Sequence, residues 1–555
     1  MVVDDTGYPS AAPAGTNRFS TSDDEQVGMQ DSPLAGRSVG VIGSGFGGLS
    51  TACYLADAGA DVTVLEKNEQ LGGRASRLEA DGFRFDMGPS WYLMPDVFER
   101  FFAHFGKEPS DYYTLSRLDP HYRIFFKDGD RVDIVPDVEA NVETFESYEA
   151  GAGERLREYL DTSETHYDVA MNQFVYEDRP RLRDWVDLDV MKAAPIGLKL
   201  VGKMDDYVSG YFENPKLQQI MQYTLVFLGG SPKNTPALYN MMSHVDFNMG
   251  VYYPDGGIGA VVDALVELGE ELGVSYRTNA EVTEIISRRQ GLELELAPAV
   301  DPAFETPDAA TVPDRAESDG GVTTAQGGER LAFDYVVSDA DYAHTEQELL
   351  PEHLRTYDAD YWESRTYAPS AFLLYLGVEG DVDPLAHHTL VLPTDWDPHF
   401  EQIFDDPEWP EDPAYYLCVP SETDDTVAPE GHSNLFALVP IAPGLEDSEA
   451  TRERYRELVL DDIAENTGVD LRDRIVFEEQ FTVSEFAERY NSMAGTALGM
   501  AHTLRQTALL RPNRRSERLP GLYFTGSYTT PGIGVPMCLI SGQHTADALL
   551  EDYGE

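Results

Sequence analysis

The chain has little positive charge and very few cysteines. Its 555 residues hold 40 Lys and Arg against 99 Asp and Glu, a formal net charge of −59, and no lysine follows Lys233. Nucleic acid is therefore not an expected partner, because its phosphates would be repelled. Cys53, Cys418 and Cys538 are scattered without metal-ligand or redox spacing. We expect them to be small buried hydrophobes and expect no metal site.

Long apolar runs are also missing. No stretch approaches the roughly 18 apolar residues of a membrane span. Residues 1–37 are rich in Asp, Ser, Gly, Pro and Ala, so they resemble neither a signal peptide nor a transit peptide and are expected to be a disordered acidic tail. The chain length predicts two or more folding units.

The acidic excess also predicts a salt requirement. Repulsion between so many carboxylates destabilises the compact state in dilute buffer, whereas at roughly 1 M salt the Debye length falls to about 3 Å. The composition therefore indicates a halophilic cytoplasm, and the alternative is an acidic protein with disordered tails.

A glycine turn near the N-terminus predicts a dinucleotide site. Residues 37–42 have the composition of a buried strand, and Gly43, Gly45 and Gly48 then form GxGxxG before an Ala- and Leu-rich helical run. A second strand over 61–65 delivers Glu66, whose carboxylate suits ribose hydroxyls. The helix amino end suits the phosphates, although glycine turns also serve packing alone.

Two further regions favour FAD over NAD. QLGGRASR at 70–77 and FRFDMGPSW at 83–91 stand where flavoproteins of the glutathione-reductase-like superfamily carry a GGR segment. Near the C-terminus, a strand over 521–525 and a turn over 526–534 precede a helix that runs from 533 to 550. The amino end of this helix suits the negative charge of a reduced flavin.

With these motifs, the chain resembles the bacterial-type phytoene desaturase family of carotenoid desaturases, which is similar to amine oxidases. The resemblance covers roughly residues 39–550 and includes these segments: GVYYPDGGIGAVVDAL at 250–265, YVVSDADYAHT at 335–345, LAHHTLVL at 385–392 and VAPEGH at 427–432. It implies an α/β fold in which a Rossmann-like FAD-binding domain of the glutathione-reductase and amine-oxidase type is interleaved with an α+β substrate domain.

The expected domains are discontinuous. Residues 38–115, 250–341 and 501–550 would form the FAD-binding domain, 116–249 and 342–500 the substrate and membrane-associated domain, and 297–330 a low-complexity insertion that extends a hairpin. Within the first domain, helix is expected over 257–272 and strands over 274–277 and 280–287. The resemblance implies these cofactor-binding residues: Gly43, Gly45, Phe46, Gly47, Gly48, Glu66, Lys67, Gly73, Arg74, Gly88, Pro89, Val282, Gly526, Ser527, Gly534, Val535 and Met537.

No dedicated nucleophile or metal is needed, because a flavin itself accepts the hydride. By resemblance, Asp189 and Lys192 are candidates for moving a proton or stabilising a carbocation, and a surface ion pair explains them equally well. His387 and His388 are adjacent, so on a strand they would point to opposite faces and make a poor metal pair.

The stretch 189–204 has more basic than acidic residues, unlike the chain as a whole. It holds Lys192, Lys199 and Lys203 against only Asp189, among apolar residues. Such a patch suits anionic lipid headgroups, and a core helix with snorkelling lysines is the alternative. The patch predicts a protein bound peripherally to the inner face of the cell membrane.

The implied activity is FAD-dependent carotenoid desaturation by hydride transfer to flavin, with quinone or oxygen as the electron acceptor. Phytoene to lycopene is the first interpretation. A 3,4-desaturation of a hydroxylated carotenoid, on the route to bacterioruberin-type pigments, is the second. An amine oxidase and a non-enzymatic prenyl-binding escort are the remaining alternatives.

Overall fold

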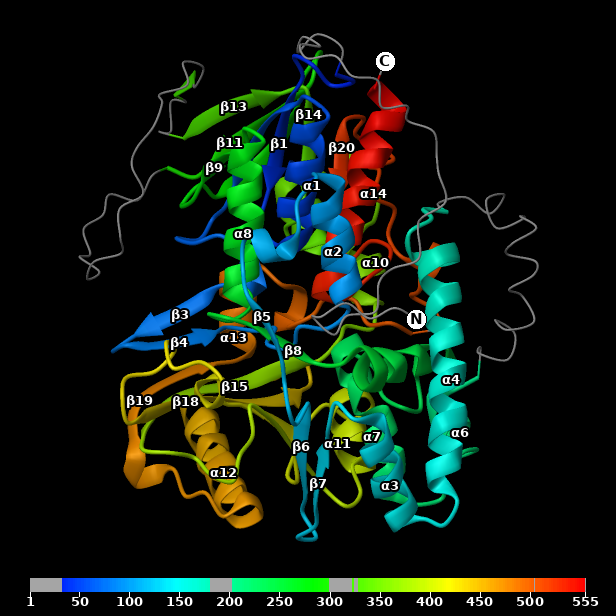
Figure 1. Ribbon diagram of the computed structural model, residues 1–555. Helices are drawn as coiled ribbons and strands as arrows, with labels where there is room; N and C mark the ends of the chain where they lie inside the picture. The colour runs from blue at the N-terminus through cyan, green and yellow to red at the C-terminus, as the bar shows by residue number, and fades with distance from the viewer. Residues whose placement is uncertain (1–31, 180–201, 299–321, 324–327, 504, 555) are drawn as a thin grey trace.

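Two lobes are stacked one on the other in the computed structural model (Figure 1), which describes residues 32–179, 202–298, 322–323, 328–503 and 505–554. One lobe holds the first and last described segments of the chain, in blue and red. The other is built around a large sheet, with strands in cyan, yellow and orange.

A five-stranded parallel sheet forms the centre of the first lobe. Its order is β20-β14-β1-β2-β9, so strands from three distant parts of the chain lie side by side. The bounds are β1 Ser38–Ile42, β2 Asp61–Leu65, β9 Ser275–Arg277, β14 Tyr335–Ser338 and β20 Leu522–Phe524. The strands expected over 37–42, 61–65, 274–277 and 521–525 are confirmed. β1, β14 and β20 are buried along almost their whole length, which fits a sheet covered on both faces, whereas β9 at the edge is partly exposed.

Three helices pack on this sheet. They are α1 Phe46–Asp57, α8 Ile258–Glu271 and α14 Val535–Tyr553, and α1 lies against α14 (Figure 1). The approach of α1 and α14 depends on Gly542, because a Cβ there would lie 2.5 Å from Ser50 Oγ and 2.8 Å from Thr51 N. The helices expected after the two glycine turns and over 257–272 are confirmed.

Smaller sheets join the two lobes and extend the first. Their strands are β10 Val282–Ser287, β11 Leu292–Leu296, β12 Val322–Thr323 and β13 Glu329–Phe333 in one sheet, β3 Arg77–Ala80 with β4 Phe83–Asp86, and β5 Leu115–Arg117 with β8 Tyr252–Pro254. The strand expected over 280–287 is confirmed. Of the insertion 297–330, residues 322–323 and 329–330 belong to strands that extend the β11 hairpin.

The second lobe contains a seven-stranded sheet in the order β19-β15-β18-β17-β16-β6-β7. Its bounds are β6 Tyr122–Phe126, β7 Arg131–Ile134, β15 Ser370–Glu379, β16 His388–Leu392, β17 Tyr415–Cys418, β18 His432–Ile441 and β19 Ile475–Phe481. Pairing is antiparallel except between β16 and β6.

Side chains alternate across this sheet. On β15, Phe372 and Leu374 pack with Tyr455 of α12 (Glu449–Thr467), whereas Leu373 and Tyr375 face the other side. Both faces are therefore buried, one under a helix and the other toward the interior of the protein.

The remaining α-helices complete the two lobes. They are α2 Pro95–His104, α3 Val138–Tyr148, α4 Ala152–Ala170, α6 Met204–Val208, α7 Pro215–Gln222, α9 Tyr342–His344, α10 Ala359–Glu363, α11 Asp397–Phe404 and α13 Val483–Tyr490.

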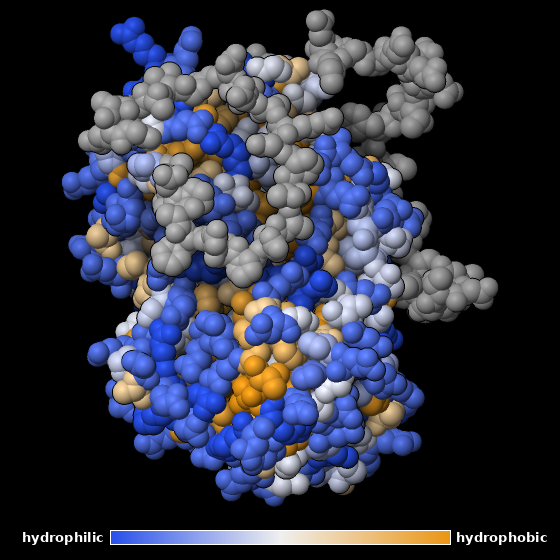
Figure 2. Space-filling model, turned by 90° about the vertical axis from the view of Figure 1, so that its left-hand side faces the viewer, coloured by the Kyte–Doolittle hydropathy of each residue, from blue (hydrophilic) through white to orange (hydrophobic). Residues whose placement is uncertain are grey.

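Part of the expected N-terminal tail is ordered. Leu34 is fully buried, and its N–H donates to the Ala58 carbonyl at 3.0 Å. An apolar side chain at this point packs into the core beside α1, so the expectation of disorder is wrong for residues 32–37. The surface in Figure 2 is mostly hydrophilic, with an apolar area in the second lobe. Among the described residues, none of the helices is long and apolar enough to cross a membrane.

Candidate cofactor and substrate site

The glycine turn after β1 leaves no room for side chains. Gly43 has φ +92°, a conformation that disfavours other residues. A Cβ on Gly47 would lie 2.8 Å from Gly526 N, and one on Gly48 would lie 2.4 Å from the Gly43 carbonyl oxygen. The turn is therefore a cradle of backbone atoms at the amino end of α1, which suits a pyrophosphate.

Glu66 lies at the end of β2 and is 4 % exposed. One carboxylate oxygen accepts hydrogen bonds from the N–H and hydroxyl of Ser44, at 3.0 and 2.6 Å, and the other accepts from Asn68 N–H at 2.9 Å. These contacts fix the carboxylate beside the glycine turn, where it can accept the ribose hydroxyls of an adenosine.

Asp339 is a half-buried carboxyl that the sequence did not single out. It follows β14, and the N–H groups of Gly45 and Gly48 donate to it. Burial raises its pKa to about 7, although these N–H groups oppose the rise. An acidic group under the phosphate cradle makes the charge of this turn sensitive to pH. The segment YVVSDAD was part of the family resemblance, but nothing in it showed that Asp339 contacts a turn almost 300 residues away.

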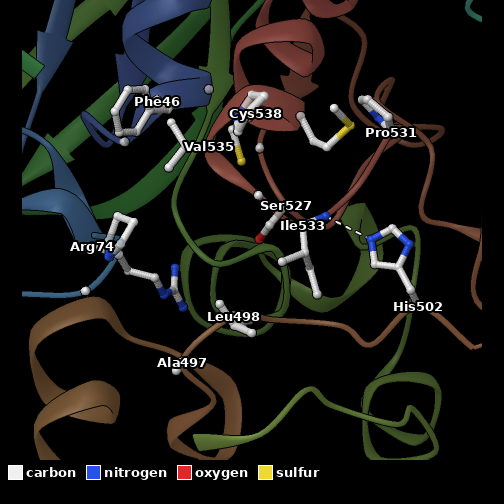
Figure 3. Close-up of a pocket in the computed structure, with 18 of the residues that line it drawn as sticks. Phe46, Arg74, Ala497, Leu498, His502, Ser527, Pro531, Ile533, Val535 and Cys538 are labelled. Atoms are coloured by element: carbon white, nitrogen blue, oxygen red, sulfur yellow. Dashed lines mark hydrogen bonds between the residues drawn. The ribbon is translucent and has the colours of Figure 1, made fainter. Parts of the chain in front are cut away.

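Arg74 reaches toward the opposite side of the same space, as Figure 3 shows. Its guanidinium stacks over Tyr490, 5.4 Å from the ring centroid, and its buried Nε has no hydrogen-bond partner among the described residues. An unpaired buried donor is costly, so a ligand with acceptor atoms fits this position.

The amino end of α14 completes the cradle. Gly534 precedes the helix with φ +118° and makes no side-chain cap. Val535 and Ser527 point toward the same cavity (Figure 3). The helix end therefore presents backbone N–H groups and a positive dipole to this space.

His502 and Arg511 hold the turn before α14, and the sequence gave no sign of either. His502 Nε2 accepts from Ile533 N–H at 2.9 Å (Figure 3), and its Nδ1 is 2.6 Å from the Tyr239 hydroxyl. Burial, and then Arg511, hold the pKa of His502 well below its usual range, so the ring is neutral. Arg511 donates to the carbonyls of Ser527 and Met500.

One cavity of about 1220 Å³ runs from the glycine turn into the second lobe. Leu373, Leu390 and Leu438 of the seven-stranded sheet form part of its wall, and Phe400 and Ile403 of α11 form another part. These side chains are aliphatic or aromatic, so this end of the cavity suits a long apolar molecule.

Nearly all the predicted cofactor residues line this cavity. They are Gly43, Gly45, Phe46, Gly47, Glu66, Lys67, Gly73, Arg74, Gly88, Pro89, Val282, Gly526, Ser527, Gly534, Val535 and Met537. Gly48 instead packs α1 against the turn. Asp189 and Lys192 lie outside the described residues.

The expectation that His387 and His388 point to opposite faces is wrong, although both are packed and hydrogen bonded. Strand β16 begins only at His388, so the alternation of a pleated strand does not govern His387. The two ring centroids are 4.5 Å apart, and both side chains are buried.

Comparisons with known proteins agree with this geometry. Residues 46–550 match the family described as flavin containing amine oxidoreductase. The chain is 70 % identical over 521 residues to a carotenoid 3,4-desaturase of Haloarcula japonica, covering 94 % of this chain and 99 % of the relative. It is 31 % identical to a 4,4'-diapophytoene desaturase (4,4'-diaponeurosporene-forming) of Staphylococcus haemolyticus, covering 93 % and 99 %.

Solved structures share the fold. Putrescine oxidase bound to putrescine has a TM-score of 0.56 at 14 % identity, covering 93 % of this chain and 99 % of that one. An oxidoreductase from Methanosarcina mazei has a TM-score of 0.55 at 16 % identity, covering 92 % and 100 %.

Fold and site together define a flavin-dependent oxidoreductase of the glutathione-reductase and amine-oxidase type. The chain belongs to the family of flavin containing amine oxidoreductases, and FAD is its cofactor. The Cβ-free cradle, Glu66 and the unpaired Nε of Arg74 fit that group.

Proposed function

We propose that the protein is an FAD-dependent carotenoid 3,4-desaturase. The observation that supports desaturation is a cavity that joins the glycine cradle to an aliphatic wall in the second lobe. The 70 % identity to the Haloarcula enzyme over nearly its whole length favours the 3,4-position. The conversion of phytoene to lycopene, our first interpretation of the sequence, has weaker support.

The residues of the chain bind the cofactor, orient the substrate and exclude water from the cavity. FAD supplies the hydride acceptor when bound. The cradle and Glu66 hold the nucleotide, while His502 and Arg511 fix the turn before α14. The aliphatic wall removes water from the hydrocarbon. Asp189 and Lys192 are proposed to move the proton that leaves with the hydride.

The other function classes have less support. A cationic amine needs a polar pocket, whereas Leu373, Leu390 and Leu438 give this cavity an aliphatic wall. An escort protein without catalysis would not need the cofactor cradle.

The test offers phytoene and a hydroxylated lycopene derivative separately, in liposomes, to the full chain with FAD in molar KCl. We expect the hydroxylated substrate alone to lose two hydrogens per double bond formed, seen by mass and by a red-shifted absorption. Conversion of phytoene but not of the hydroxylated carotenoid would restore the first interpretation. Repeating the assay without oxygen, with and without a quinone, identifies the electron acceptor.

We also propose that the cavity opens toward the cytoplasmic face of the cell membrane. Lys203, at the end of the basic stretch 189–204, is exposed, and its backbone forms an isolated β-bridge with Pro236. Nearby Leu238 lines the cavity and is 37 % exposed, and Leu510 is 56 % exposed beside the lining residue Leu509. Exposed leucines and lysines together suit an anionic bilayer.

Liposome co-sedimentation checks this arrangement. Reversing the charge at Lys192, Lys199 and Lys203 should release the protein from anionic liposomes in a salt-matched assay. Reversal at Lys107, which pairs with Glu271 away from the cavity, serves as the control. Unchanged binding of the triple variant contradicts the membrane proposal.

A further inference from the structure

Three buried side chains with metal-ligating atoms meet behind the cavity wall. One ligand atom from each of His387, His388 and Cys418 lies within 4.8 Å of the others. The fold creates this group, because β16 pairs with β17 so that His388 stands opposite Cys418. His388 and Cys418 are separated by 30 positions in the sequence, so a search for ligand spacing did not find the arrangement.

Hydroxyl groups contact the Nδ1 atoms of both histidines. His387 Nδ1 is 2.8 Å from Thr423 Oγ1, and His388 Nδ1 is 2.6 Å from the Tyr416 hydroxyl and 4.0 Å from Cys418 Sγ. In both rings, Nε2 is buried and has no partner among the described residues. A ligating imidazole typically donates Nδ1–H to a fixed acceptor and turns the lone pair of Nε2 to the ion. Without an ion, both nitrogens are left unsatisfied at a cost.

His121 is a further buried histidine on the neighbouring strand, outside the group of three. It is fully buried, and neither ring nitrogen has a partner in the part of the chain that the structure describes. Because β6 and β16 run parallel with Arg123 opposite Thr389, His121 and His387 both lie two residues before this pair. His121 is also close enough to act electrostatically on His388.

The surroundings favour a cation. Asp424 acts electrostatically on His387, and its carboxylate is held by Tyr253 and by the backbone N–H groups of Gly256 and Thr426. Nitrogen and sulfur ligands in this number suit Zn²⁺ and not Mg²⁺ or Ca²⁺.

We propose that His387, His388 and Cys418 bind one structural Zn²⁺ ion. On binding, the Cys418 thiol gives its proton to solvent and its sulfur forms the Zn–S bond, with no change of oxidation state. The ion would tie β16 and β17 together. It would also fix His388, on which Trp91 of the cavity wall stacks at 4.2 Å with the rings 7° from parallel.

Metal analysis of the full chain with FAD tests the site. After expression with zinc and extensive dialysis in molar KCl, we expect about one zinc per chain by mass spectrometry. Cys418→Ser should reduce this content at least tenfold. Cys53→Ser, which removes another buried cysteine on α1, should leave it unchanged. Bound flavin absorbance shows that each variant is folded.

Cobalt provides a reading that needs no variant. Co²⁺ offered to the unsubstituted chain should give a thiolate-to-cobalt charge-transfer band and the d–d absorption of a tetrahedral site. A chain without stoichiometric transition metal and without this band overturns the proposal, as does a folded Cys418→Ser variant with full zinc content. Neither result depends on which carotenoid the enzyme converts.

Discussion

Glu66 shows how a single buried side chain controls cofactor affinity. Its carboxylate is already fixed by Ser44 and Asn68, so binding of a ribose needs no rearrangement. We expect Glu66→Gln to raise the Kd for FAD about tenfold, because a charge-assisted hydrogen bond becomes a neutral one. Titration of the apoprotein by flavin fluorescence measures this. Glu79→Gln, on an exposed strand pair, is the control, and equal affinities would remove Glu66 from the site.

Asp339 makes the stability of the apoprotein depend on pH. Its folded-state pKa is raised to about 7, so the folded protein holds a proton that the unfolded chain loses near pH 4. Stability from this group is therefore present at low pH and falls as pH rises between about 4 and 7.

The Asp339→Asn variant isolates this contribution. Between pH 5 and 7, the unsubstituted apoprotein should lose about 2 kcal/mol more of its unfolding free energy than the variant. Denaturant unfolding at constant molar KCl measures the difference. Parallel pH profiles for the two proteins would show that Asp339 does not titrate in this range.

At the residue scale, the sequence predicted what local spacing determines. Gly43, Gly45 and Glu66 stand at fixed distances along one strand-turn-helix-strand unit, so their roles were readable. Asp339 acts on a turn that is distant in sequence, and no local pattern shows that His502 and Arg511 hold the turn before α14. The group formed by His387, His388 and Cys418 became visible only when the pairing of β16 with β17 was known.

At the scale of elements, the contact between α1 and α14 is a close joint of the cofactor lobe. A larger residue at Gly542 has to push α14 away from Ser50 and Thr51. We expect Gly542→Val to destabilise the protein by about 2 kcal/mol and to lower its melting temperature by about 2 °C. Thermal unfolding with flavin release as the signal checks this. Gln543→Val, at the neighbouring half-buried position, should change little, and equal shifts would show that the joint is not special.

The elements of the first lobe were predictable, and the large sheet of the second was not. β1, β2, α8 and α14 are each marked by glycine turns and by periodic apolar residues in one short segment. By contrast, β6 pairs with β16 across more than 260 residues, and the order of seven strands depends on such long-range pairs. The continuous apolar run of β15 hints at a strand with two buried faces.

At the scale of the whole molecule, charge repulsion should make folding depend on salt. The formal net charge is −59, and many of the arginines and lysines are already paired with carboxylates, such as Arg456 with Glu478 and Lys216 with Asp128. The carboxylates without a basic partner repel one another unless salt screens their charges. We expect the melting temperature to rise between dilute buffer and molar KCl, measured by circular dichroism. A melting temperature that stays constant over this range would contradict the halophilic interpretation.

The position of β20 at the edge of the parallel sheet bears on how the enzyme is made. Ribosomes release the chain from its N-terminus, at about 5–20 residues per second, so β1, α1 and β2 emerge long before β20 and α14. Gly526, Ser527 and Gly534 come from this last part. The flavin can be captured securely only after translation has passed them, so a prematurely terminated chain never acquires a working redox centre.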